Sequence, residues 1–155
     1  MPLLLAGCAT VSEPPLEGNA TVEFSQAGEY PILLFRVLTN GSDCSSPERV
    51  PPESNFLQNR FRPLIVPSNQ EVAFSASWSH LSGVMMSSCN SVISFTPKAG
   101  AKYRIRYFAD SATCGARVYE LKSDGADLQE VIEPSARKRI PNLPFLATGP
   151  FCKVE

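Results

Sequence analysis

The chain has 155 residues, of which 43% are hydrophobic, and this is enough for one continuous core in a single domain. Its 14 basic and 15 acidic side chains give a net charge of -1, which excludes a global basic field for binding nucleic acid. The 14 prolines and the low share of charged residues, 19%, exclude a helical bundle, because proline removes a backbone donor and clashes inside helices.

The chain starts with an apolar run that ends in two small residues and a cysteine, Leu5-Ala6-Gly7-Cys8. A signal peptidase needs an apolar stretch with small side chains at the cut, and a lipoprotein precursor needs a thiol directly after it. The run resembles the lipobox of bacterial lipoproteins, which implies that Cys8 is the lipidated residue. No Lys or Arg precedes it, so we expect that the start of the precursor is missing. A hydrophobic N-terminal strand with a buried free cysteine is the alternative.

The residue after the cysteine is Ala9, not aspartate, and the resemblance to Gram-negative lipoproteins then implies the outer membrane, facing the periplasm. Residues 1–8 would be the remnant of the signal segment, and residues 9–19, which contain Pro14-Pro15, a flexible tether. No later stretch approaches the roughly 20 apolar residues that span a bilayer. Residues 20–155 are therefore predicted to form one domain, held at the membrane by the lipid on Cys8.

Apolar and polar side chains alternate with period two along much of the chain, a pattern that predicts half-buried strands. Strands are expected around residues 22–24, 30–38, 63–66, 72–78, 92–96, 102–109, 114–121 and 128–132. The run at 30–38 is densely apolar and suits a central strand covered on both faces. Residues 41–59 are expected to be irregular, with room for one helical turn at 55–58. About eight short strands predict an all-β fold, either an antiparallel β-sandwich or a partly closed barrel, stapled by disulfides.

Residues typical of turns separate several of these strands. They occur at Asn40-Gly41-Ser42-Asp43, at Pro97-Lys98-Ala99-Gly100 and at Ser123-Asp124-Gly125. Proline fixes φ and glycine permits a positive φ, as a tight turn requires. We expect residues 92–96 and 102–109 to pair as a hairpin, and the strand around Val118 to continue a meander.

Four cysteines remain beside Cys8, namely Cys44, Cys89, Cys114 and Cys152. An even number at wide spacings in an oxidising compartment predicts two disulfides. A four-cysteine zinc site is the alternative, but such sites normally bring their ligands in close pairs, and none is present here. The expected meander places Cys89 and Cys114 at the same end of a sheet. We therefore favour Cys89–Cys114, with Cys44–Cys152 as the second bridge.

The side chains offer no catalytic constellation. The one histidine, His80, lies in Ser77-Trp78-Ser79-His80 and is expected to end its strand at a turn before Ser82-Gly83. A triad also needs an orienting carboxylate and an oxyanion hole, for which the sequence gives no signal. Common nucleophile, metal and phosphate-binding motifs are absent from the sequence. We expect no enzymatic activity, no metal and no cofactor.

Two segments near the C-terminus are candidate partner contacts. Arg137, Lys138 and Arg139 form a basic cluster that could meet anionic lipid headgroups or peptidoglycan, although a solvated turn is the simpler interpretation. Residues 140–151 carry no charge and include Leu143, Phe145 and Leu146, while their prolines disfavour a helix or a central strand. This tail either covers the core, which we favour, or presents an apolar surface to a partner.

The run Phe95-x-Pro97-x-x-Gly100-x-x-Tyr103-x-Ile105, followed by Cys114 and a strand to Leu121, resembles a hairpin of small envelope lipoproteins with β-sandwich domains. With the lipobox, it implies a small outer-membrane lipoprotein. By analogy of fold, the expected function is a non-enzymatic protein-interaction or structural accessory module of an outer-membrane complex or secretion machine. A periplasmic inhibitor or small-ligand binder resembling the lysozyme-inhibitor lipoproteins is the alternative. The tyrosine of their Ser-Gly-x-x-Tyr loop is missing from Ser82-Gly83-Val84-Met85-Met86.

Overall fold

The structure is a computed structural model that describes residues 18–28, 34–49, 63–110, 113–124, 127–142 and 152–154. These residues form strands and no helix, so the predicted all-β fold is confirmed. The strands are β1 (Asn19–Gly28), β2 (Leu34–Asn40), β3 (Ser45–Arg49), β4 (Leu64–Pro67), β5 (Val72–Ser82), β6 (Met85–Phe95), β7 (Lys102–Ala109), β8 (Cys114–Asp124), β9 (Asp127–Ile132), β10 (Arg137–Pro141) and β11 (Cys152–Val154). Part of the stretch expected to be irregular is a strand, β3, and residues 55–58 lie outside the described residues.

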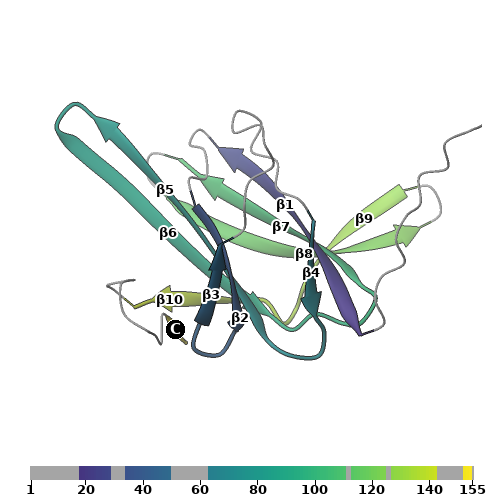
Figure 1. Cartoon of the computed structure of the whole chain (residues 1–155). Helices are drawn as coiled ribbons and strands as arrows, with labels where there is room; N and C mark the ends of the chain where they lie inside the picture. The colour runs from purple at the N-terminus through teal and green to yellow at the C-terminus, as the bar shows by residue number, and fades with distance from the viewer. Residues whose placement is uncertain are drawn as a thin grey trace, which may run out of the picture.

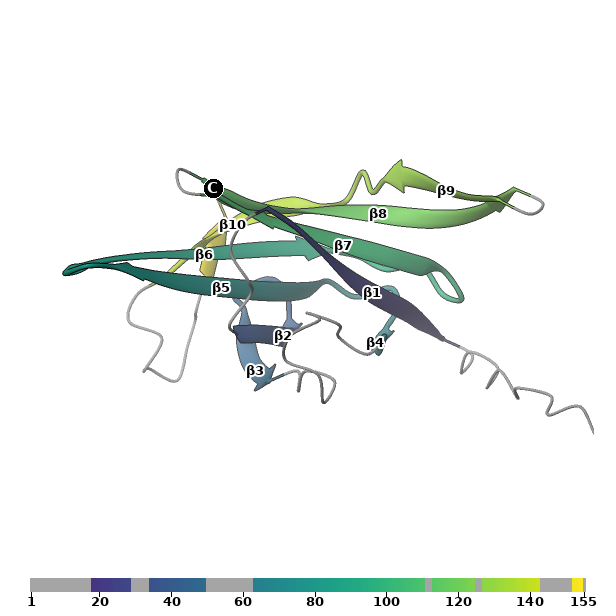
Figure 2. The ribbon, with the colours of Figure 1, turned by 90° about the horizontal axis from the view of Figure 1, so that it is seen from above.

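The strands make two sheets that lie one over the other (Figures 1 and 2). One sheet has the order β4-β1-β7-β8-β9, and the other has the order β11-β10-β6-β5-β2-β3. Neighbours pair antiparallel except β1 and β7, which run parallel from Thr21 opposite Lys102 to Gly28 opposite Ala109. Parallel neighbours need a long connection, and here it contains the strands β2 to β6. The sandwich is therefore mixed and not wholly antiparallel.

The core lies between the sheets and is built from the alternating side chains of their strands. On β7, Tyr103, Ile105 and Tyr107 are buried, whereas the residues between them are partly exposed. The facing sheet contributes Phe74 from β5 and Phe95 from β6. The ring of Phe95 lies 5.8 Å from that of Phe74 and 4.9 Å from that of Tyr103, measured between centroids. These rings connect the two sheets through a continuous aromatic contact.

The predicted hairpin between residues 92–96 and 102–109 is wrong, because β6 and β7 belong to different sheets. The turn at Pro97 to Gly100 instead carries the chain from one sheet to the other. Gly100, with φ of 72°, donates its N–H to the carbonyl of Asn19 in β1, and Pro97 accepts from the N–H of Asn69. Stacking β6 over β7 buries the apolar faces of both strands against each other, which pairing them side by side would not do.

β5 and β6 form a long hairpin whose tip extends beyond the other strands (Figures 1 and 2). β5 continues through His80 to Ser82, so the prediction that His80 ends its strand is wrong. The turn lies at Gly83 and Val84, where glycine has a positive φ of 62°. Pairing with Ser87 in β6 keeps the backbone at His80 extended past the edge of the core.

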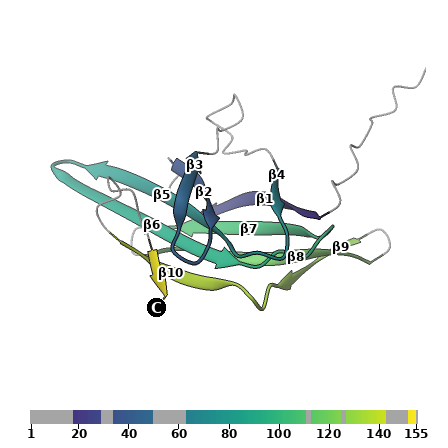
Figure 3. The ribbon, with the colours of Figure 1, turned by 60° about the horizontal axis from the view of Figure 1, so that its bottom comes forward.

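The sheet that contains β2 has a second apolar cluster on its outer face. Val37 of β2 packs in the main core, while the next residue, Leu38, packs with Cys44, Ala73, Val92 and Cys152. β2 is therefore covered on both faces at Val37 and Leu38, whereas the burial of the dense apolar run at 32–35, on which the prediction rested, lies outside what the structure describes. Figure 3 shows β2 and β3 beside β5, with β10 on the other side of β6.

Both predicted disulfides, Cys44–Cys152 and Cys89–Cys114, are present. The first ties β11 to the turn between β2 and β3 and closes the outer cluster. The second joins β6 to β8 across the two sheets, with its Cα atoms 6.3 Å apart. The pairing was predicted from a meander of β6, β7 and β8, and that premise is wrong because β6 lies in the opposite sheet. The two residues still meet, because the sheets approach each other at this flank.

Candidate functional site

β8 has neighbours on both sides along only part of its length. β7 pairs with β8 from Cys114 to Leu121, whereas β9 pairs with it only from Tyr119 to Asp124. Within the described residues, no strand therefore pairs with the segment from Cys114 to Val118 on the side away from β7, where β6 approaches it and is joined to Cys114 by the disulfide from Cys89. We call this segment the free edge of β8. A free edge presents unpaired N–H and C=O groups, which are a template for another extended chain.

One hydrogen bond fixes the direction of the backbone groups along the free edge. Glu133, in the connection that leaves β9, donates its N–H to the carbonyl of Val118 with an N···O distance of 3.0 Å. The carbonyl of Val118 thus points away from β7. Successive residues of a strand direct their backbone groups to opposite sides, so Ala116 and Cys114 also point away from β7. The backbone groups of Gly115 and Arg117 point toward β7.

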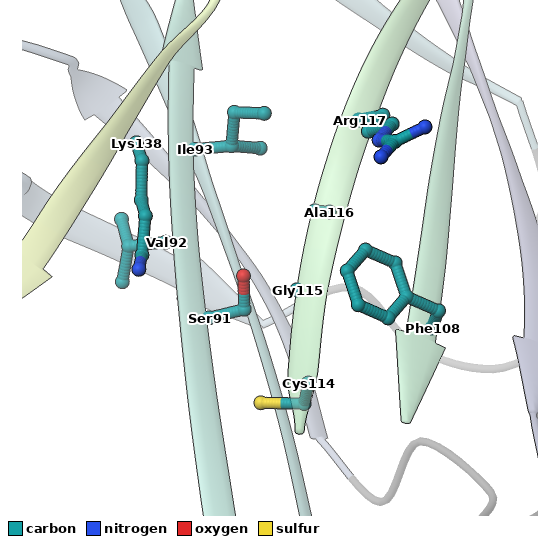
Figure 4. A pocket seen from close by; sticks show the side chains of 9 residues that line it. All are labelled: Ser91, Val92, Ile93, Phe108, Cys114, Gly115, Ala116, Arg117 and Lys138. Atoms are coloured by element: carbon teal, nitrogen blue, oxygen red, sulfur yellow. The ribbon is translucent and has the colours of Figure 1, made fainter. Parts of the chain in front are cut away.

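A cavity of about 160 Å³ opens beside the free edge (Figure 4). Its lining comes from β8, from Phe108 at the end of β7, and from β6 and β10 of the opposite sheet. The disulfide Cys89–Cys114 closes the side of the cavity at the start of β8. The lining residues are Ser91, Val92, Ile93, Phe108, Cys114, Gly115, Ala116, Arg117 and Lys138.

Gly115 lets the ring of Phe108 lie directly over the backbone at the free edge. A Cβ atom at Gly115 would lie 2.5 Å from Cζ of Phe108, so any larger residue would have to displace the ring. The two residues are opposite each other in the β7–β8 register. The ring therefore packs on bare backbone and forms one wall of the cavity, as Figure 4 shows.

Two cations line the cavity, and no anionic side chain does. Arg117 and Lys138 are both exposed, and neither has a carboxylate partner among the described residues. The other lining residues are uncharged. The lining of the cavity therefore carries a positive charge that no carboxylate among the described residues pairs.

The neighbouring arginines on the outer face of the same sheet are balanced. Arg104 bonds to Glu23 at 3.1 Å and to Glu130 at 2.7 Å, and Arg106 bonds to Glu130 at 2.7 Å. The hydrogen bond to Glu23 is the largest cause that raises the pKa of Arg104. Arg106 also lies over the ring of Tyr119, 5.1 Å from its centroid. Glu23 and Glu130 are thus both engaged by Arg104 and Arg106, and neither pairs with Arg117.

The predicted basic cluster is separated by the fold, and the interpretation as a solvated turn is wrong. Arg137, Lys138 and Arg139 begin the strand β10, which pairs with β6. Arg137 and Lys138 are exposed, but Arg139 is only 4% exposed and is not available as a partner contact. The strand also includes Pro141, which is tolerated because it pairs only with β11, beyond the part of β10 that pairs with β6.

Arg139 is buried because it completes a polar cluster under the outer face of its sheet. It donates from Nε to Ser94 at 2.8 Å and forms a short ion pair with Glu71, while Ser94 donates to Glu71 at 2.7 Å. Burial raises the pKa of Glu71, but the hydrogen bonds from Ser94 and Arg139 and the charge of Arg139 outweigh it, so the pKa is below its usual value. Arg139 therefore has a structural role.

The remaining predicted site residues fall elsewhere. Cys8, Leu143, Phe145 and Leu146 lie outside the described residues. In the described part of the chain, no group of three His, Cys, Asp or Glu side chains is placed to hold a metal ion. The same residues include no helix with the length and apolar character to cross a membrane.

The free edge and its cavity were missed by the sequence analysis. Alternation predicts which face of β8 is buried, but it carries no signal for the point at which β9 stops pairing.

Comparison of this chain with protein-family models, with curated proteins and with solved structures found no match.

Proposed function

We propose that this protein is a non-enzymatic interaction module of the bacterial envelope, which binds an extended segment of a partner protein at the free edge of β8. The single observation that supports this proposal is the outward backbone of Ala116, with which no described strand pairs, beside an open cavity. An extended peptide can add to such an edge through main-chain hydrogen bonds, while pockets beside the edge select its side chains.

The dimensions of the edge limit the length of the added segment. From Cys114 to Val118 the strand covers about 13 Å at 3.3 Å per residue. Ala116 directs both its N–H and its C=O outward, so an added strand gains about two hydrogen bonds there, each contributing about 0.5–1.5 kcal/mol. Cys114 offers none, because its disulfide holds β6 with the two Cα atoms only 6.3 Å apart. The disulfide to β6 keeps the edge in place before binding, which reduces the entropy lost on association.

The proposal includes attachment to the outer membrane through a lipid on Cys8, which the lipobox Leu5-Ala6-Gly7-Cys8 supports. A lipid anchor would hold the module near the envelope proteins with which it associates. The precursor, expressed in a Gram-negative host, should sediment with outer membranes, and Cys8→Ser should release it. A Cys8→Ser protein that stays membrane-bound after a high-salt wash would contradict the anchor.

Site-specific photocrosslinking in cells tests the binding function. A photoreactive phenylalanine analogue replaces Arg117 beside the free edge or, as a control, the exposed Asn69 in the turn before β5. We expect a discrete protein adduct at position 117 only, and its loss when Ala116→Pro is added. Proline removes the outward N–H of Ala116 without removing a bond to β7. Equal adducts at both positions, or an adduct unaffected by Ala116→Pro, would refute the proposal.

A further inference from the structure

We infer that the partner segment is acidic, with two consecutive carboxylates at the point where it passes Arg117 and Lys138. This inference depends on the proposed strand addition, because it names the chemistry of the segment that occupies the free edge. The observation that carries it is the pair of unbalanced cations on the lining of the cavity.

Arg117 carries an electrostatic cost in the unbound protein. In the β7–β8 register it lies directly opposite Arg106, and like charges opposite each other in a sheet are unfavourable. Arg106 is relieved by Glu130 and by the ring of Tyr119, whereas Arg117 has no carboxylate among the described residues. A carboxylate supplied by a partner would complete the alternating row of charges on this face.

Lys138 approaches the same site from the opposite sheet. It pairs with Ile93 of β6, and its neighbour Arg139 is buried on the outer face, so strand alternation turns Lys138 toward the cavity. Figure 4 shows Lys138 next to Val92 beside β6, whereas Arg117 projects from β8 on the side of Phe108. The two cations therefore line the same cavity from two strands, Arg117 from β8 and Lys138 from β10.

This arrangement defines the sequence of the segment. A residue added opposite Arg117 places its side chain on the face of Arg117, and the residue next to it points to the other face, toward Lys138. Two consecutive acidic residues would thus each meet one cation. A single carboxylate could satisfy only one of them.

The test uses fluorescence anisotropy with labelled octapeptides and the oxidised protein. The peptides alternate threonine and valine except for the two central positions, which are both glutamate, both glutamine or both lysine. Each exposed ion pair changes affinity by about threefold, so the glutamate peptide should bind about tenfold more tightly than the glutamine peptide. The lysine peptide should bind more weakly than both. The preference should decrease with added salt.

Variants separate this inference from the proposed function. Arg117→Gln with Lys138→Gln should remove the tenfold preference for glutamate, whereas the control Lys102→Gln, at the far end of β7, should keep it. Ala116→Pro should abolish binding of the glutamate and glutamine peptides alike. Equal binding of these two peptides, lost with Ala116→Pro, would overturn the acidic partner and leave strand addition intact. Glutamate binding that survives Ala116→Pro would refute strand addition, and no binding of any peptide at millimolar concentration would refute both.

Discussion

Replacing Arg139 by Met should destabilise the protein far more than replacing its exposed neighbour Lys138. Arg139 is 4% exposed and holds Glu71 and Ser94, so its loss leaves a carboxylate without its cation. Breaking a buried pair costs 3–5 kcal/mol, and since the Glu71 side chain is 28% exposed, water offsets part of this. We expect a cost of about 2–3 kcal/mol, which lowers Tm by about 6–9 °C in a domain of this size.

Thermal unfolding followed by near-ultraviolet circular dichroism, with the disulfides intact, measures this difference. Lys138→Met is the control and should change Tm by less than about 2 °C, as exposed substitutions do. Adding Glu71→Gln to Arg139→Met removes the uncompensated charge and should recover at least half of the loss. The pKa of Glu71 lies below its usual 4.5 in the folded protein, so the ion pair between Glu71 and Arg139 stabilises the folded state fully above pH 4.5. The difference in Tm between the wild type and Arg139→Met should therefore become smaller as the pH falls below 4.5. Equal Tm values for Arg139→Met and Lys138→Met would refute the reasoning.

Three other perturbations have calculable outcomes. Replacing both cysteines of one bridge by serine should lower the free energy of unfolding, measured with urea, by an amount that grows with the length of the closed loop. We expect about 5 kcal/mol for Cys44–Cys152, which spans 108 residues, and about 3.5 kcal/mol for Cys89–Cys114, which spans 25. A larger cost for Cys89–Cys114 would contradict this chain-entropy account. Gly115→Ala should lower the free energy of unfolding by about 1–3 kcal/mol, because the added methyl group meets the ring of Phe108. Adding Phe108→Ala removes that ring, so the double variant should lose less stability than the two single variants together. Fully additive losses would contradict the packing of Phe108 on Gly115. Burial raises the pKa of Tyr107 to about 12, so wild-type stability should fall between pH 10 and 12 as the unfolded chain loses protons first. Tyr107→Phe should flatten that decline in thermal unfolding, and an identical decline would exclude Tyr107 as its cause.

The sequence predicted which residues face the core, because alternation determines the face of a strand directly. Tyr103, Ile105 and Tyr107 are buried as their spacing indicated. Alternation does not determine which strand is the neighbour. The turn from Pro97 to Gly100 has the composition of a hairpin turn, yet it connects two sheets, because burying Phe95 against Tyr103 requires β6 and β7 to face each other.

The candidate site depends on contacts between residues that are distant in sequence. Arg139 belongs to a run of three basic residues that indicates a solvated surface, and its partner Glu71 lies 68 positions away. Only the tertiary structure shows that Arg139 is buried while Lys138 lines a cavity. The free edge exists because the chain leaves β9 at Ile132 and crosses to the other sheet, an event that has no local sequence signal.

Amide hydrogen exchange at Ala116 and Arg117 tests the central claim most directly. In the free protein the N–H of Arg117 is directed to β7 and should be protected, whereas the N–H of Ala116 is directed to the free edge and should exchange rapidly. Saturation with the glutamate octapeptide should protect Ala116 and leave Arg117 unchanged. Protection of Ala116 already in the free protein, or rapid exchange that persists when the peptide is bound, would contradict strand addition at β8.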